Sequence, residues 1–83
     1  MNVRITRTSN GKYHLMAQSP IYGATTLLLT IDEIFAETNI LLTEHDCKLL
    51  DAGRTIIKRI GRDYWYSATS AKAHEQNGDN QNV

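Results

Sequence analysis

The residues best suited to chemistry in this sequence are few, and their spacing does not support a catalytic site. Cys47 is the single cysteine, and a cysteine acts as a nucleophile when a general base lies beside it. The nearest histidine is His45, and residues two apart on a helix do not share a face. We therefore expect Cys47 to be a small buried residue that packs against Leu42 at the start of a helix.

The remaining candidates indicate neither a metal site nor an enzyme. The histidines stand at positions 14, 45 and 74 and lack the spacing at which zinc ligands converge. Glu37, Glu44 and Asp46 could be paired acids, but carboxylates near helix starts are expected because they suit the helix dipole. The sequence also lacks the glycine-rich phosphate loop and the serine-elbow motif. We predict a protein that is not an enzyme and holds no metal ion or cofactor.

Basic and aromatic residues in the second half of the chain favour a binding function. On a helix, Arg54, Lys58 and Arg62 would form one ridge, because each is four residues from the next. The aromatic residues beside it are typical of a core, of a protein interface or of a stacking platform for single-stranded nucleic acid. The predicted partner-binding residues are Arg54, Lys58, Arg59, Arg62, Tyr64, Trp65 and Tyr66.

The charges are segregated along the chain although the formal net charge is zero. Residues 1–29 carry three basic and no acidic residues, and residues 30–46 carry five acidic and no basic residues. Residues 47–62 carry five basic residues and one acidic residue. Such local sums determine surface potentials more directly than the whole-chain charge does.

Protein binding is the function that these patterns favour. We expect a small regulator or inhibitor that occludes a surface of its protein partner, as a phage or mobile-element inhibitor of a host protein would. The alternative is a small DNA- or RNA-binding regulator, although a neutral chain lacks the strongly basic footprint of such domains. The possible nucleic-acid-binding residues are Arg4, Arg7, Lys12, Arg54 and Lys58.

Composition predicts a cytoplasmic protein that has no membrane partner. No apolar run approaches the length of about 20 residues that spans a bilayer, and the N-terminus lacks the layout of a secretory signal. A single cysteine fits a reducing compartment.

The strand pattern predicts a small antiparallel β-meander of about three strands, with a fourth possible. Asn10 and Gly11 favour a two-residue type I′ turn in a hairpin over residues 1–17. That turn would place Ile5 opposite Met16 and leave neither face cleanly apolar. The third predicted strand covers residues 24–29, which are rich in β-branched and apolar residues.

A short and a long α-helix complete the predicted α+β fold. Thr30 and Glu33 have capping-box spacing, which predicts a helix over residues 31–38 that ends at Asn39. A pattern with helical period predicts a second helix over residues 43–61, with Gly53 on its apolar stripe. The aromatic run 64–66 is expected to form a fourth strand or a strap over the helix end.

The predicted domain covers residues 1–67, and residues 68–83 are predicted to be a disordered polar tail because their composition cannot offset the entropy of ordering. The apolar stripe of the long helix is wide for so small a sheet. We therefore expect a weak homodimer in which Gly53 permits close packing of two helices.

Overall fold

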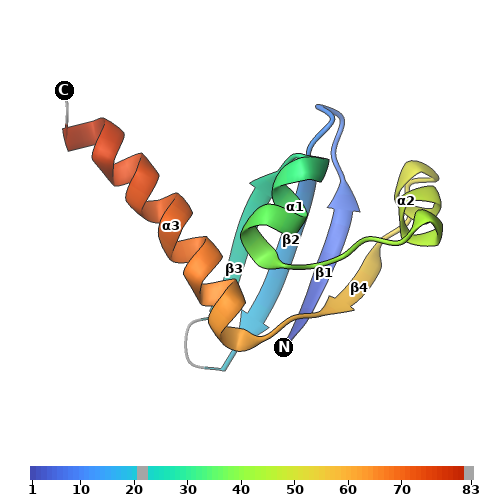
Figure 1. Ribbon diagram of the computed structural model, residues 1–83, viewed down its shortest axis with the longest axis horizontal. Helices are drawn as coiled ribbons and strands as arrows, with labels where there is room; N and C mark the ends of the chain where they lie inside the picture. Colours follow the sequence, from blue (N-terminus) through green and yellow to red (C-terminus); the bar gives the residue numbers. More distant parts are fainter. Residues whose placement is uncertain (21–22, 82–83) are drawn as a thin grey trace.

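The computed structural model describes residues 1–20 and 23–81, with side chains described through residue 71. One sheet holds four antiparallel strands in the order β3-β2-β1-β4, and three helices accompany it (Figure 1). This confirms the predicted α+β class and the antiparallel sheet. The elements are β1 (Asn2–Arg7), β2 (Tyr13–Ser19), β3 (Gly23–Leu29), α1 (Ile31–Thr38), α2 (Glu44–Asp51), β4 (Ile56–Arg59) and α3 (Arg62–Gln81).

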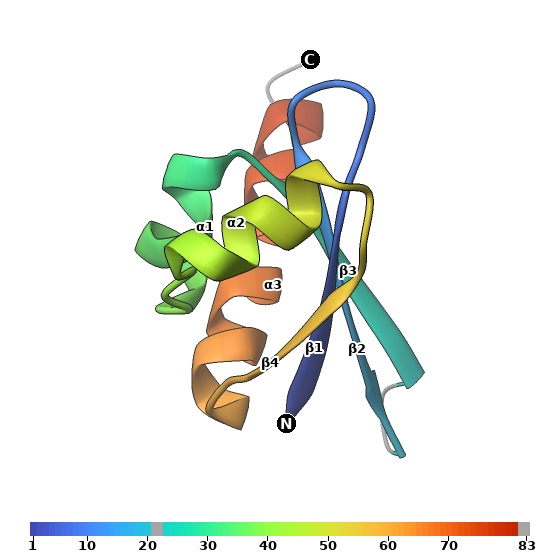
Figure 2. The same ribbon diagram turned by 90° about the vertical axis from the view of Figure 1, so that its right-hand side faces the viewer.

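All three helices lie on the same side of the sheet, and its other side is uncovered (Figure 2). Helix α2 contacts β1 and β4, whereas α1 and α3 contact β3 and each other. The inner face of the sheet supplies most of the core. The buried apolar residues are Val3, Ile5, Leu15, Ala17, Leu27, Leu29, Ile34, Ile40, Leu50, Ile56, Ile60, Trp65 and Ala68.

The register of the β1–β2 hairpin differs by one residue from the predicted register. Ile5 pairs with Leu15, not with Met16, and a hydrogen bond from the Thr8 N–H to the Lys12 carbonyl closes a three-residue loop (2.9 Å). Gly11 has positive φ (74°) and Asn10 does not, so the turn is not type I′. A shift of one residue moves every side chain of a strand to the opposite face. The observed register places Val3, Ile5, Leu15 and Ala17 together on the buried face and leaves Met16 on the other.

Helix α1 begins and ends where the sequence predicts. The Thr30 side chain accepts a hydrogen bond from the Glu33 N–H, and the Glu33 carboxylate accepts one from the Thr30 N–H. Asn39 ends the helix in the left-handed region, with φ of 60°. The fully buried Thr38 hydroxyl donates to the Ile34 carbonyl and accepts from the Ile40 N–H, so its polar atom is satisfied within the core.

The prediction of a long helix over residues 43–61 is wrong. Helix α2 ends at Asp51, and residues 56–59 form β4, which pairs with β1. Gly53 is not a packing point but the residue with positive φ (81°) that follows the helix. The Gly53 N–H donates to the Leu50 carbonyl and the Arg54 N–H to the Leu49 carbonyl, the hydrogen-bond pattern of a Schellman motif. The proposed homodimer contact through Gly53 therefore has no helix to support it.

The aromatic run 64–66 lies in the first turns of α3, so it is neither a strand nor a strap; the fourth strand is β4. Trp65 is completely buried, and its indole N–H donates to the Thr25 hydroxyl (2.7 Å). Ala68 is also buried, although residue 68 is the first residue of the predicted tail. The later turns of α3 extend away from the sheet (Figure 1). Disorder of the tail stays a prediction.

Candidate functional site

The predicted basic ridge does not exist, because its residues belong to different elements. Arg54 lies in the loop after α2, Lys58 in β4, and Arg62 begins α3. Lys58 is also engaged, since its Nζ lies 2.5 Å from Asp46 Oδ2 in a largely buried ion pair. Of the three aromatic residues, Trp65 is a core residue and Tyr64 is exposed, while Tyr66 is half-buried.

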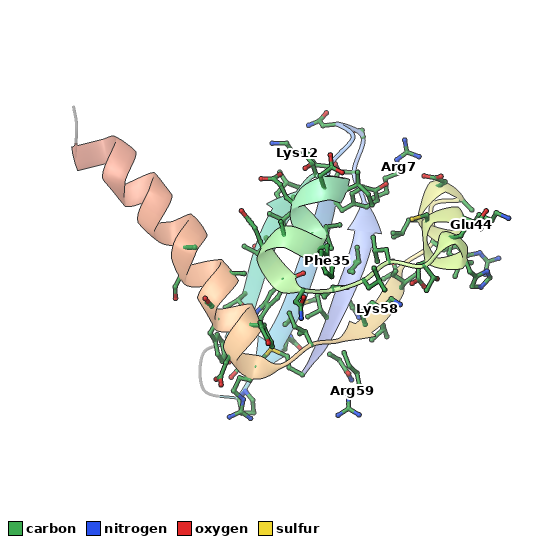
Figure 3. All side chains as sticks on the ribbon, in the orientation of Figure 1. Arg7, Lys12, Phe35, Glu44, Lys58 and Arg59 are labelled. Carbon is green, nitrogen blue, oxygen red and sulfur yellow. The ribbon has the colours of Figure 1, made fainter. Side chains whose placement is uncertain are left out.

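The residues suggested for nucleic-acid binding are also dispersed. Arg7 is paired with Asp51 of α2 (3.0 Å), and Lys12 lies in the hairpin loop. Figure 3 shows Arg7 beside α2, Lys12 at the hairpin, and Arg59 at the opposite end of the sheet. Arg4 is the one member of the suggested set that lies on the uncovered face of the sheet, where Arg59 lies as well.

An apolar groove between α1 and α2 is the surface that the sequence did not reveal. Helix α1, the connection after it and Cys47 of α2 line an open hollow of about 150 Å³. We call this hollow the α1–α2 groove, and its lining residues are Ile31, Ile34, Phe35, Ile40, Leu41, Leu42 and Cys47.

Three large apolar side chains of the α1–α2 groove face solvent. Leu41 is 70% exposed, Phe35 54% and Ile31 43%. They account for half of the large exposed apolar side chains within the described residues, whereas the hollow on the uncovered face of the sheet includes one of them, Ile57. Ile31 and Phe35 are four residues apart and therefore share a face of α1. Clustering of this kind marks an interaction surface more often than scattered exposure does.

Two exposed carboxylates lie on the helices that contribute to the α1–α2 groove. Asp32 is three residues from Phe35, and Glu44 is three residues from Cys47, so each acid neighbours a lining residue on its helix. Both are exposed, and within the described part of the chain neither has an ion-pair partner. The nearby Asp46 differs, because hydrogen bonds from Lys58 and from the Thr43 N–H hold the pKa of that carboxyl below its ordinary value of 3.8.

The uncovered face of the sheet has the opposite charge. Alternation along the strands places Arg4, His14 and Arg59 on this face, and every residue that shares it is neutral. A broad open hollow of about 460 Å³ lies there, lined by Asn2, Arg4, Met16, Gln18 and Ile57. The remaining residues of this uncovered sheet face are Thr6, Ala24, Thr26, Leu28 and Thr55.

Catalytic and metal candidates are not brought together. Cys47 is half-buried and lines the α1–α2 groove beside Leu42. No group of three metal-binding side chains occurs among residues 1–20 and 23–71. His74 lies beyond the residues whose side chains are described. Among the described elements, no helix has the length and apolar character needed to cross a membrane.

Comparison with known proteins adds no relationship from which a function could be transferred. No family model, no curated protein and no solved structure matches the chain.

Proposed function

We propose that this chain is a non-enzymatic protein-binding regulator that acts by covering a surface of its partner. The observation that carries the proposal is the cluster of Ile31, Phe35 and Leu41 around the α1–α2 groove. Burying a fully exposed side chain of this size contributes about 1.5–3 kcal/mol. Because these three are 43–70% exposed, a partner that covers all of them gains part of that amount from each. The predicted cytoplasmic location, weak homodimer and phage or mobile-element origin stay predictions.

The test is affinity capture with a variant of the groove and a matched control. Phe35→Ser combined with Leu41→Ser removes two apolar side chains from the groove. Leu28→Ser combined with Ile57→Ser removes two similarly exposed side chains from the uncovered sheet face. We expect the unaltered chain and the control to retain the same protein from a source-cell lysate at equal stoichiometry. The groove variant should lose at least about 90% of it, a loss of about 1.4 kcal/mol or more.

Circular dichroism must first show that both double variants are folded. Two results would contradict the proposal. One is that the unaltered chain retains no stoichiometric partner, and the other is that the groove variant retains its partner as fully as the control does.

Nucleic-acid binding is a second candidate because of the uncovered sheet face. Arg4 and Arg59 lie on that face without an ion-pair partner among the described residues, and the face carries no acid. The proposal ranks second because two arginines and a histidine are a small basic footprint for a nucleic-acid-binding domain.

A salt titration tests this second candidate. If both arginines contact phosphates of duplex DNA, replacing both by Ala should flatten the slope of log K against log salt by about two units. Arg54→Ala combined with Arg62→Ala removes the same charge elsewhere and should leave the slope unchanged. If the two double variants have the same slope, the uncovered sheet face is not the nucleic-acid-binding surface. If the unaltered chain shows no salt-dependent affinity, the proposal of nucleic-acid binding is wrong.

A further inference from the structure

We propose that the occupant of the α1–α2 groove is a basic amphipathic helix of the partner protein. This inference rests on the proposed function and assigns a chemical class to the segment that the partner contributes. Three features carry it: the size of the groove, the nature of its walls, and the charge around it.

The size of the groove favours a side chain over a small-molecule ligand. Its volume of about 150 Å³ is below the about 300–1,000 Å³ typical of small-molecule pockets. It is open, and Phe35, Leu41 and Ile31 extend its apolar surface outward. One apolar side chain of the partner would fill the hollow. Other apolar side chains of the partner, one helical turn away from the first, would cover Ile31, Phe35 and Leu41.

The walls of the groove favour a helix over an extended segment. An added strand gains affinity from main-chain hydrogen bonds to a sheet edge, and no strand lines this groove. Its lining comes from α1, from the connection after it and from Cys47 of α2, so the groove offers side chains and no strand edge to a partner. A partner helix satisfies its own backbone hydrogen bonds internally, so it can present side chains alone to such a surface.

The charge around the groove favours a basic partner. The segment that builds most of it, residues 30–46, carries five acidic residues and no basic residue. Glu33 caps α1, Asp46 is paired with Lys58, and Glu37 is half-buried. The other two acids, Asp32 and Glu44, are exposed without an ion-pair partner among the described residues. Lys or Arg residues that flank apolar anchors would complement these two carboxylates.

A second copy of the chain does not supply such a helix. Each of the three helices carries more acidic than basic residues: none against three in α1, one against three in α2, and two against three in α3. Two copies that docked helix to groove would therefore bring like charges together, which is unfavourable.

Two synthetic helical peptides test the inference. Both carry leucine at positions i, i+3, i+4 and i+7; one has lysine and the other glutamate at the remaining positions. Titration by fluorescence anisotropy in about 0.15 M salt should show at least about tenfold tighter binding of the lysine peptide. Asp32→Asn combined with Glu44→Gln should weaken that binding about 2–30-fold, as expected for two exposed ion pairs.

The matched control is Asp51→Asn combined with Asp63→Asn, which removes the same net charge away from the groove and should leave the affinity within about twofold. Phe35→Ser should abolish binding of the lysine peptide. Equal affinity for the two peptides, or an equal effect of the two acid-removing variants, would overturn the inference.

The inference and the proposed function fail in different ways. If partner capture requires Phe35 and Leu41 but the lysine peptide does not bind, the basic helix is wrong and protein binding at the groove stands. If capture is indifferent to the groove, the proposed function itself falls. Analytical ultracentrifugation of the chain without peptide tests whether a second copy occupies the groove. If the chain self-associates and Phe35→Ser abolishes that association, the occupant is a second copy and the inference of a basic helix is overturned.

Discussion

Trp65→Ala is expected to destabilise the fold by about 3–5 kcal/mol, the usual cost of truncating a buried tryptophan. The side chain is fully buried and joins α3 to the sheet through Thr25 of β3. Natural domains are stable by only about 5–15 kcal/mol, and one of 83 residues belongs at the low end. The variant should therefore unfold at far lower urea concentration, or be unfolded without urea.

Two controls separate packing from hydrogen bonding and from surface effects. Thr25→Val removes the acceptor of the indole N–H while conserving volume, and leaving that buried donor unsatisfied should cost about 1–3 kcal/mol. Tyr64→Ala removes an exposed aromatic residue from the adjacent position and should change the free energy of unfolding by less than about 0.5 kcal/mol. Equal effects of the tryptophan and tyrosine variants would contradict the core assignment of Trp65.

Asp46→Asn is expected to lower the free energy of unfolding by about 1–3 kcal/mol, because it breaks a largely buried ion pair and leaves the Lys58 amine without its carboxylate. The same carboxylate accepts the Thr43 N–H at the start of α2 (2.9 Å). Asp51→Asn is the matched control, since Asp51 also joins α2 to the sheet, through Arg7, but its side chain is 62% exposed. That exposed pair should contribute about 0–1 kcal/mol.

The Asp46 interactions should also appear in the pH dependence of stability. Its pKa is lowered in the folded state, so its contribution is complete above the ordinary aspartate pKa and is lost as the pH falls through the folded-state value. Urea unfolding between about pH 5 and pH 2 should therefore show a smaller loss of stability for Asp46→Asn than for the unaltered chain. Parallel pH profiles for the two proteins would contradict this coupling.

Local signals in the sequence succeeded where the structure depends on neighbouring residues alone. The capping box at Thr30 and Glu33 and the left-handed Asn39 determine α1 within a few residues. The hairpin shows the limit of this reasoning. Asn10 and Gly11 favour a two-residue turn, but burial of Val3 and Ile5 with Leu15 requires the neighbouring register. Core burial in four strands outweighs a turn preference, and the conflict was visible as the lack of an apolar face in the predicted hairpin.

The prediction of one long helix over residues 43–61 failed because the apolar residues between positions 49 and 60 have helical spacing although they belong to separate elements. Leu49, Leu50, Ile56 and Ile60 fit a helical stripe, yet they belong to a helix end, a strand and the loop after it. Two signals pointed the other way. Gly53 is a helix terminator at least as readily as an interior residue, and Thr55 and the two isoleucines after it favour a strand.

The α1–α2 groove was hidden for a different reason. The sequence shows that Ile31, Ile34 and Phe35 lie on one face of a helix, but not how much of that face the sheet covers. Ile34 is buried, whereas Ile31 and Phe35 on that face are 43% and 54% exposed. How much of the face is covered depends on tertiary packing, which the helical pattern of α1 alone does not give.

The position of β1 in the sheet has a consequence for the order in which the protein acquires its structure during synthesis. β1 precedes the other described strands along the chain, yet it pairs with β2 on one side and β4 on the other, and Thr6 meets Thr55 across 49 residues. Until β4 leaves the ribosome, one edge of β1 has no partner, and exposed strand edges invite pairing with other chains. Pairing of β4, which bears Lys58 and Arg59, covers that edge of β1 and completes the sheet.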